Sequence, residues 1–149
     1  MIEPITSKQN KKIKLLKILL KDKNYMFLDN PKLIVEAKKA GFNIDYLLIN
    51  ETYNGKTDYG GENVVVSESV FKSFSQTVNS QGLIGILKYG KKTLKKPQAD
   101  FLVLDELQDP GNVGTLLRSA LGADFKDIYL LNSARVSSDK VVRSSMGAI

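Results

Sequence analysis

The sequence contains no cysteine and no histidine. Without cysteine the chain can form no disulfide bond, no thiolate nucleophile and no cysteine-ligated zinc site. Without histidine it lacks the usual general base, the serine–histidine–aspartate triad and most transition-metal sites. Any catalysis by this chain therefore depends on carboxylates, lysine, arginine, tyrosine or a cofactor.

Long apolar runs are also missing. No stretch approaches the roughly 18 apolar residues that a membrane-spanning helix needs, and the start MIEPITSKQNKKIKLL lacks the apolar core and cleavage site of a signal peptide. We therefore expect a cytoplasmic protein without membrane contact. A length of 149 residues, with 42% hydrophobic and 26% charged residues, predicts one ordinary globular domain or two small ones.

Acidic residues are too few to balance the lysines, which gives a net charge of +6. Seven lysines and one aspartate lie between residues 8 and 23, and residues 88–96 contain five lysines and no acid. Such clusters fit contact with a phosphate backbone, although solvated helix faces and a solubilising linker are the alternative. The candidate nucleic-acid-binding residues are Lys8, Lys11, Lys12, Lys14, Lys91 and Lys92.

The first basic cluster lies on a predicted amphipathic helix that ends near Leu20. Thr6 or Ser7 is placed to cap its start, and the lysines fall mostly outside its apolar stripe. That stripe consists of Ile13, Leu16, Leu19 and Leu20.

Strands and helices alternate along the rest of residues 1–90. In DNPKLIVEAKKAG, Asn30 is placed to cap a helix, Pro31 to begin it and Gly41 to end it. A further short helix is predicted after Ser67. The strands are predicted at YMFL, YLLIN, VVV and GLIGILK. This alternation predicts an α/β unit with a largely parallel sheet.

A second α/β pattern follows a charged linker at residues 91–99. In residues 100–149, FLVLD and DIYLLN read as buried strands, NVGTLLRSALG as a helix that ends at Gly122, and a last helix begins at Ser137 or Ser138. About 50 residues with two strands are too few to enclose a core. We therefore expect that the chain is a fragment or that this part leans on the first domain or on a partner.

The segment GILKYGKK imitates a phosphate-binding P-loop through Gly85, Gly90 and Lys91. A P-loop needs serine or threonine next, to hold magnesium, and a helix after it. Here Lys92 and a proline-containing linker follow, so nucleotide triphosphate binding is not expected.

The segment DPGNVGTLLR follows a strand and opens a helix, but it has only two glycines of a dinucleotide-binding fingerprint. Pro110 is expected to stiffen the turn, and Gly111 to permit a backbone conformation that other residues resist. Asn112 stands where an N-cap is expected.

Arg118 follows near the same helix end. Backbone amides at a helix start together with a guanidinium form a credible clamp for a phosphate or a ribose. In the alternative interpretation Asn112 only caps the helix, and Arg118 pairs with a carboxylate such as Asp105 or Asp109.

The stretch LDELQDPGNVGTLLRSALGADFKDIYLLNSARVSSDKVVRSSMGAI resembles the first conserved block of the SpoU/TrmH ribose methyltransferases, members of the SPOUT class, in which a strand leads into D-P-x-N-x-G-x-x-x-R. Upstream, ITSKQNKKIKLLKIL, LIVEAKKAG and TVNSQGLIGILK resemble the small N-terminal RNA-binding domain that often precedes that methylase. The resemblance implies a small α/β/α RNA-binding domain of ribosomal-protein type in residues 1–90. It also implies the first part of an α/β-knot methyltransferase domain in residues 100–149.

The resemblance further implies methyl transfer from S-adenosylmethionine to a ribose 2′-hydroxyl of ribosomal or transfer RNA. Asn112 and Arg118 match the catalytic first motif of the family. Because a guanidinium stays protonated at working pH, we expect Arg118 to stabilise the developing alkoxide rather than to act as a plain base. The resemblance also implies a homodimer for the full-length protein.

Two departures from the family pattern qualify this interpretation. Asp29 and Asn30 stand where many relatives carry Glu-Gly after the FL strand. The second and third motifs of the family, which tie the knot and build the cofactor pocket, are absent from the sequence. We therefore expect this chain to be an inactive fragment that binds the cofactor poorly. The competing hypothesis is a stand-alone RNA-binding module without catalysis.

Overall fold

The structure, a computed structural model, describes residues 3–75, 77, 79–90 and 94–149. It divides the chain into two compact units that meet in sequence between Tyr89 and Gly90. We call them unit 1 and unit 2 and describe each separately. Among the described residues, no helix is long and apolar enough to cross a membrane.

Unit 1 combines helices with a four-stranded sheet. Its elements in chain order are α1 (Lys11–Lys21), β1 (Tyr25–Leu28), α2 (Pro31–Lys39), β2 (Tyr46–Asn50), β3 (Glu62–Val66), α3 (Glu68–Phe71) and β4 (Leu83–Lys88).

The sheet of unit 1 is mixed, so the prediction of a largely parallel sheet is wrong. Its strand order is β1-β4-β2-β3, and β4 runs antiparallel to both of its neighbours while β2 and β3 are parallel. A parallel connection needs a crossover that returns along the sheet. The α3 helix is only about 6 Å long, which is too short to carry the chain back along β3. Strand β4 therefore starts at the edge where β3 ends and runs in the opposite direction.

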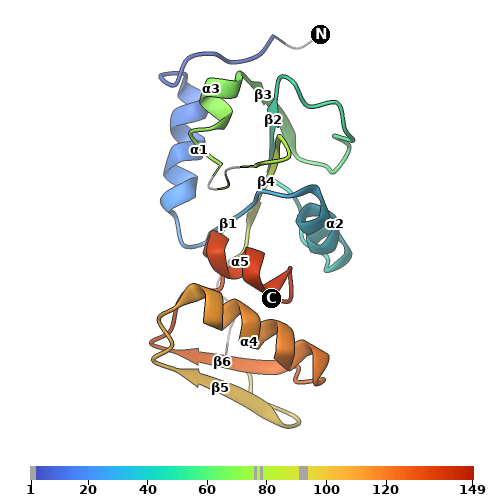
Figure 1. Ribbon diagram of the computed structural model, residues 1–149, viewed down its shortest axis with the longest axis vertical. Helices are drawn as coiled ribbons and strands as arrows, with labels where there is room; N and C mark the ends of the chain where they lie inside the picture. Colours follow the sequence, from blue (N-terminus) through green and yellow to red (C-terminus); the bar gives the residue numbers. More distant parts are fainter. Residues whose placement is uncertain (1–2, 76, 78, 91–93) are drawn as a thin grey trace. The chain divides into compact units, whose positions relative to one another are not determined.

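Helices cover both faces of this sheet (Figure 1). On one face, Leu16 of α1 and Phe71 of α3 join Leu48 of β2 in a buried cluster. On the other face, Ile34 of α2 lies so close to Gly85 of β4 that a Cβ at Gly85 would stand 2.8 Å from the Ile34 Cγ1 atom. The sheet is therefore the middle of three layers, and its strand side chains are buried alternately above and below it.

The α1 helix begins later than the sequence predicts. Its N-cap is Asn10, whose side-chain Oδ1 accepts the backbone N–H of Lys12 at 2.8 Å. The prediction of Thr6 or Ser7 as the cap is wrong, because Ser7 instead accepts the N–H of Gln9 in the turn before the helix. The apolar stripe is confirmed, since Ile13 and Leu16 are fully buried.

The predicted ends of α2 are confirmed. Asn30 accepts the backbone N–H of Lys32 at 2.8 Å, Pro31 is the first helical residue, and Gly41 follows the helix with a left-handed φ of 86°. Ser67 is the N-cap of α3, as predicted, although its side chain makes no capping hydrogen bond.

Unit 2 contains β5 (Phe101–Asp105), α4 (Pro110–Gly122), β6 (Asp127–Leu131) and α5 (Asp139–Ser145). The two strands are parallel neighbours, and both helices lie on the same side of them (Figure 1). Leu104 of β5 meets α4 and α5 side chains in a small buried core that consists of Leu104, Val113, Leu117 and Val141. The predicted start of the last helix at Ser138 is confirmed.

The opposite face of the β5–β6 pair is open within unit 2. Phe101 and Val103 of β5 are 49% and 44% exposed, and the Phe101 ring meets the Tyr129 ring edge to face at 5.6 Å. Parallel strands are normally covered on both faces. Unit 2 thus holds its helices on one face of a thin sheet, and the other face, where the Tyr129 hydroxyl donates to the Lys95 carbonyl, stays partly exposed.

Candidate functional site

The α4 helix begins just after the carboxyl end of β5. Asp109 is its N-cap, and its Oδ1 atom accepts the backbone N–H of Asn112 at 2.8 Å. Pro110 is the first helical residue, where a missing N–H costs nothing. The prediction that Asn112 caps the helix is therefore wrong. Gly111 is also helical and does not have a positive φ, so its predicted turn conformation is wrong as well.

Placing Asn112 inside the first turn leaves its side chain available. The residue is exposed, and among the described residues no group forms a hydrogen bond with its side-chain amide. The Asp109 carboxylate takes over the capping role, which removes the simplest purely structural explanation for Asn112.

Arg118 lies on the exposed side of α4, six residues after Asn112. That spacing places it about 9 Å farther along the helix axis and about 120° around it. Thr115 lies between the two, and its hydroxyl donates to the Gly111 carbonyl at 2.9 Å. Because helical side chains lean toward the N-terminus, we expect the long Arg118 side chain to extend toward the turn that carries Asn112. Asn112, Thr115 and Arg118 thus form one polar ridge, which we call the α4 ridge.

The alternative in which Arg118 pairs with an aspartate is not observed. Arg118 forms no salt bridge with any residue that the structure describes, whereas Asp109 lies 3.6 Å from the Lys140 Nζ atom of α5. The hydrogen bond from the Asn112 N–H and the charge of Lys140 hold the pKa of Asp109 below its usual value. The guanidinium of Arg118 therefore faces solvent while the nearby carboxylate is already engaged.

Gly114 fixes α4 against α5. A Cβ at Gly114 would stand 1.8 Å from the Ser144 Oγ atom and 2.8 Å from the backbone nitrogen of Ser145. The Ser144 hydroxyl also lies 3.2 Å from the Pro110 carbonyl oxygen, to which it donates. Only a glycine permits this approach, so the glycine in the N-x-G spacing sets the position of the α4 ridge.

The loops after β5 and β6 are joined at the same edge of the sheet, and the sequence analysis missed this connection. The Ser133 hydroxyl accepts the N–H of Leu107 and donates to the Leu104 carbonyl, both at 3.0 Å. Glu106 and Asn132, the first residues after the two strands, have left-handed φ values of 53° and 45°. Ligands of parallel α/β sheets bind outside such carboxyl ends. Asn132 is a residue type that tolerates this conformation and was the available signal.

The predicted nucleic-acid-binding lysines of unit 1 divide into two groups. Lys8, Lys11 and Lys14 are exposed. Lys12 instead pairs with Glu62 of β3, with 2.7 Å between its Nζ and the carboxylate oxygen. The other two predicted lysines, Lys91 and Lys92, lie outside the described residues.

The departure at Asp29 has a structural consequence. Asp29 is 7% exposed and follows β1 directly. Its carboxylate accepts hydrogen bonds from the hydroxyls of Ser75, Thr77 and Ser80, with 2.6 Å and 2.9 Å for the first two. Asp29 therefore anchors the chain before β4, while the neighbouring Asn30 caps α2.

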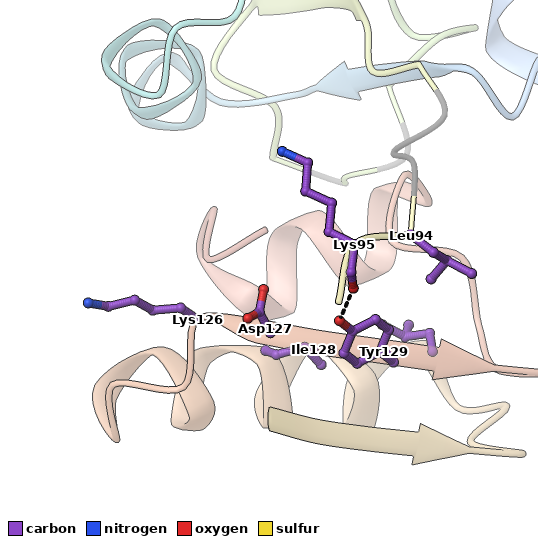
Figure 2. Close-up of a pocket in the computed structure, with 7 residues that line it drawn as sticks. Leu94, Lys95, Lys126, Asp127, Ile128 and Tyr129 are labelled. Atoms are coloured by element: carbon purple, nitrogen blue, oxygen red, sulfur yellow. Dashed lines mark hydrogen bonds between the residues drawn. The ribbon is translucent and has the colours of Figure 1, made fainter. Parts of the chain in front are cut away.

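A hollow of about 430 Å³ lies in unit 2 between residues 94–95 and β6. Figure 2 shows the Tyr129 hydroxyl donating to the Lys95 carbonyl, a bond of 2.6 Å, while the Lys126 side chain extends away from the ring. The charged residues of its lining are Lys95, Lys126 and Asp127. None of the predicted site residues lines this hollow.

Comparison with known proteins places this geometry in a family. Residues 100–149 match the model of the SpoU rRNA Methylase family. The 23S rRNA (guanosine(2553)-2′-O)-methyltransferase of Bacillus subtilis is 26% identical over 155 residues, which cover 99% of this chain and 62% of that protein. The chain thus spans about three fifths of this relative.

Solved structures of RNA methyltransferases are similar in fold to this chain. A crystal structure of an RNA 2′-O ribose methyltransferase has a TM-score of 0.77 at 29% identity and covers 98% of this chain and 62% of that one. An AdoMet-bound rRNA methyltransferase from Sinorhizobium meliloti has a TM-score of 0.78 at 24% identity over 98% of this chain and 61% of that one, which shows the fold.

These matches confirm the resemblance to the SpoU/TrmH methyltransferases that was based on the D-P-x-N-x-G-x-x-x-R segment. They also confirm a mixed α/β fold like that of these enzymes. Residues 100–149 thus belong to the SpoU rRNA Methylase family, and the chain as a whole is similar to RNA methyltransferases of the SpoU/TrmH type.

Proposed function

We propose that the full-length protein containing this chain transfers a methyl group from S-adenosylmethionine to a ribose 2′-hydroxyl in ribosomal or transfer RNA. Family membership supports the reaction class, and the names of the Bacillus relative and of the matched structure include 2′-O methylation. The observation that carries the proposal is the α4 ridge, which presents an exposed guanidinium without a partner among the described residues and, six residues earlier on the same helix, an uncommitted amide.

In the proposed reaction Arg118 binds and orients the target hydroxyl. A guanidinium keeps its proton at any working pH, so Arg118 donates hydrogen bonds to the oxygen and stabilises the negative charge that develops there. The Asn112 amide holds the adjacent ribose or phosphate, which fixes the line of attack. The hydroxyl proton leaves to an RNA phosphate or to a group outside this chain.

S-adenosylmethionine, when bound, supplies a methyl group on a sulfonium that is already a good leaving group. The hollow beside β6 does not fit this cofactor, because its lining carries two ammonium groups against one carboxylate, a balance that disfavours a sulfonium. We assign no residue of this chain to the cofactor. We also propose that this chain alone binds the cofactor weakly and is inactive. The full-length protein is proposed to be cytoplasmic and to form a homodimer.

Unit 1 is the proposed RNA-binding part. The support is its charge, since residues 1–89 contain 13 lysines and no arginine against nine acidic residues. An excess of lysine on a small α/β unit fits electrostatic contact with a phosphate backbone.

Substitution of Arg118 in the full-length protein tests the proposal. We expect Arg118→Ala to abolish most transfer of labelled methyl groups to ribosomal RNA, and Arg118→Lys to restore little, because a single ammonium lacks the planar fork of donors. RNA affinity should stay within a few-fold of the wild type. Lys126→Ala, which removes an exposed cation of the same unit, is the matched control.

Three outcomes would contradict the proposal. Full methylation by Arg118→Ala would remove the assigned role. Methylation of the 2′-oxygen makes the adjacent phosphodiester bond resistant to alkali. Labelled methyl groups found on bases, and not on such alkali-resistant nucleotides, would refute the ribose chemistry. RNA binding by the full-length protein without any methyl transfer would support the stand-alone binding module instead.

A further inference from the structure

The five lysines of α1 do not share one role. Residues 11–21 contain five lysines and no acidic residue, but two of the five side chains turn inward to unit 1 and three do not. The difference comes from the groups that unit 1 offers to each side chain. Helix position alone does not explain it, because Lys17 lies three residues after Lys14 and four before Lys21.

Lys12 ties α1 to the sheet. Its Nζ atom lies 2.7 Å from the Glu62 carboxylate and 5.0 Å from the centre of the Tyr46 ring. Tyr46 and Glu62 stand opposite each other in the β2–β3 ladder, so Lys12 bridges both strands. The hydrogen bond from Lys12 to Glu62 raises the pKa of the lysine.

Lys17 ties α1 to the segment after α3. Its Nζ atom donates to the Ser73 carbonyl and lies 4.0 Å from the centre of the Phe74 ring. Partial burial, with a smaller contribution from Lys8, lowers the pKa of Lys17. Both inward lysines therefore serve the packing of unit 1 and are poorly placed to meet a partner.

The remaining three lysines form one outward stripe. Lys11, Lys14 and Lys21 are exposed, and none of their side-chain ammonium groups has a hydrogen bond or salt bridge with a described residue. The spacing of Lys11, Lys14, Ile18 and Lys21 follows one helix face over about 15 Å. We call this set the α1 stripe.

Two aliphatic side chains interrupt the positive charge of the α1 stripe. Ile18 is 65% exposed and Leu15 is 39% exposed. Asp22, which follows α1 directly, forms no salt bridge with Lys11, Lys14 or Lys21 in the described part of the chain, and its Oδ1 atom accepts the backbone N–H of Asn24 at 2.8 Å and the Asn24 side-chain amide at 2.9 Å. The surface thus offers three uncompensated ammonium groups around an exposed apolar ridge.

We infer that the α1 stripe is the docking surface for the RNA substrate, with Lys11, Lys14 and Lys21 on consecutive phosphates and Ile18 against a sugar between them. This inference rests on the proposed function for the identity of the polyanion. Charge complementarity favours a phosphate backbone, because mobile lysines bind phosphates as point charges without demanding a fixed geometry. The α1 stripe differs from the sequence-based set of RNA-binding lysines, since it leaves out Lys8 and Lys12 and adds Lys21.

The test measures salt-dependent binding of the 149-residue chain to a fluorescein-labelled stem-loop RNA. We expect the triple variant Lys11→Gln, Lys14→Gln, Lys21→Gln to reduce the slope of log affinity against log salt by about 2, because each phosphate that a lysine neutralises on a single strand adds ~0.7 to that slope. The triple variant Lys39→Gln, Lys56→Gln, Lys72→Gln removes the same charge from other exposed positions of unit 1 and should leave the slope unchanged. Ile18→Ser should weaken binding a few-fold without changing the slope.

The outcomes separate this inference from the proposed function. If the wild-type chain shows no salt-dependent RNA binding, the RNA partner is wrong. If wild-type and stripe variant bind with equal slopes while RNA binding persists, only the docking surface is wrong. If polyglutamate binds the wild-type chain as tightly as RNA does and the stripe variant loses both, the surface is a site for an acidic protein, which overturns the inference. Unchanged circular dichroism of each variant checks the fold.

Discussion

Unit 1 and unit 2 use the same kinds of element in different ways. In unit 1, helices cover both faces of a four-stranded sheet whose central strand β4 is buried from Leu83 to Leu87. In unit 2, α4 and α5 cover one face of a two-stranded sheet, and Phe101 and Val103 remain exposed on the other. We therefore expect stability to be concentrated in unit 1, whereas unit 2 holds its candidate catalytic residues on a thinner sheet.

The comparison predicts that truncating a sheet side chain is costly in unit 1 and nearly neutral on the open face of unit 2. Leu48 of β2 is fully buried in the cluster that the sheet forms with α1 and α3, so Leu48→Ala should lower the free energy of unfolding by about 2–5 kcal/mol. Val103→Ala, at 44% exposure, should change it by about 0.5 kcal/mol or less. Urea denaturation of both variants measures this difference, and equal losses would refute the comparison.

Within unit 2, the packing of α4 against α5 is expected to be the sensitive point. Gly114→Ala places a methyl group against Ser144 and the backbone of Ser145, and overpacking of this kind costs about 1–3 kcal/mol. Gly122→Ala lies in the same helix with no atom within 4 Å of the added Cβ. It should therefore be neutral or stabilise the helix by up to ~1 kcal/mol.

Thermal denaturation of the two glycine variants gives the measurement. We expect Tm shifts of opposite sign for the two variants, or a decrease in Tm for Gly114→Ala alone. Equal shifts would show that the close approach of α4 and α5 does not hold the α4 ridge in place.

The smallest expected effect concerns pH. The Asn112 N–H and Lys140 lower the pKa of Asp109 in the folded chain. The ionised carboxylate therefore stabilises unit 2 above the unfolded pKa of about 3.9, and this stabilisation is lost as the pH falls through the lower folded pKa. The stability difference between wild type and Asp109→Ala should shrink over that acidic range.

NMR titration of the Asp109 carboxyl group checks the cause. Lys140→Gln should move the pKa only part of the way back, because the hydrogen bond from the Asn112 N–H is the larger cause. A full return to the usual value would assign the shift to Lys140 instead.

Local patterns in the sequence predict local structure well where backbone chemistry decides it. Asn30, Pro31 and Gly41 mark the ends of α2 correctly, because each residue type satisfies a specific requirement of a helix terminus. The N-cap of α4 was misassigned because Asp109 and Asn112 are both good caps. The choice between them depends on Pro110, which takes the first helical position, and on Lys140, which is far away in sequence.

Features that depend on distant segments could not be predicted. The antiparallel direction of β4 depends on the path of the segment between β3 and β4. Asp29 anchors that segment through hydrogen bonds between residues about 50 positions apart in the sequence. The division of the α1 lysines has the same origin, because Lys12 is distinguished from Lys11 only by the Glu62 carboxylate of β3. In the candidate site, the sequence motif identified Asn112 and Arg118. Ser133 joins the loops at the carboxyl ends of β5 and β6, and this connection could be recognised only once the fold was known.

The division of labour between the units is the central claim, and steady-state methylation by the full-length protein tests it most directly. Arg118→Ala and the triple variant of Lys11, Lys14 and Lys21 are compared for kcat and KM on the same RNA. We expect Arg118→Ala to lower kcat with little change in RNA affinity, and the lysine variant to raise KM with kcat retained. The reverse pattern, or loss of both parameters in both variants, would contradict it.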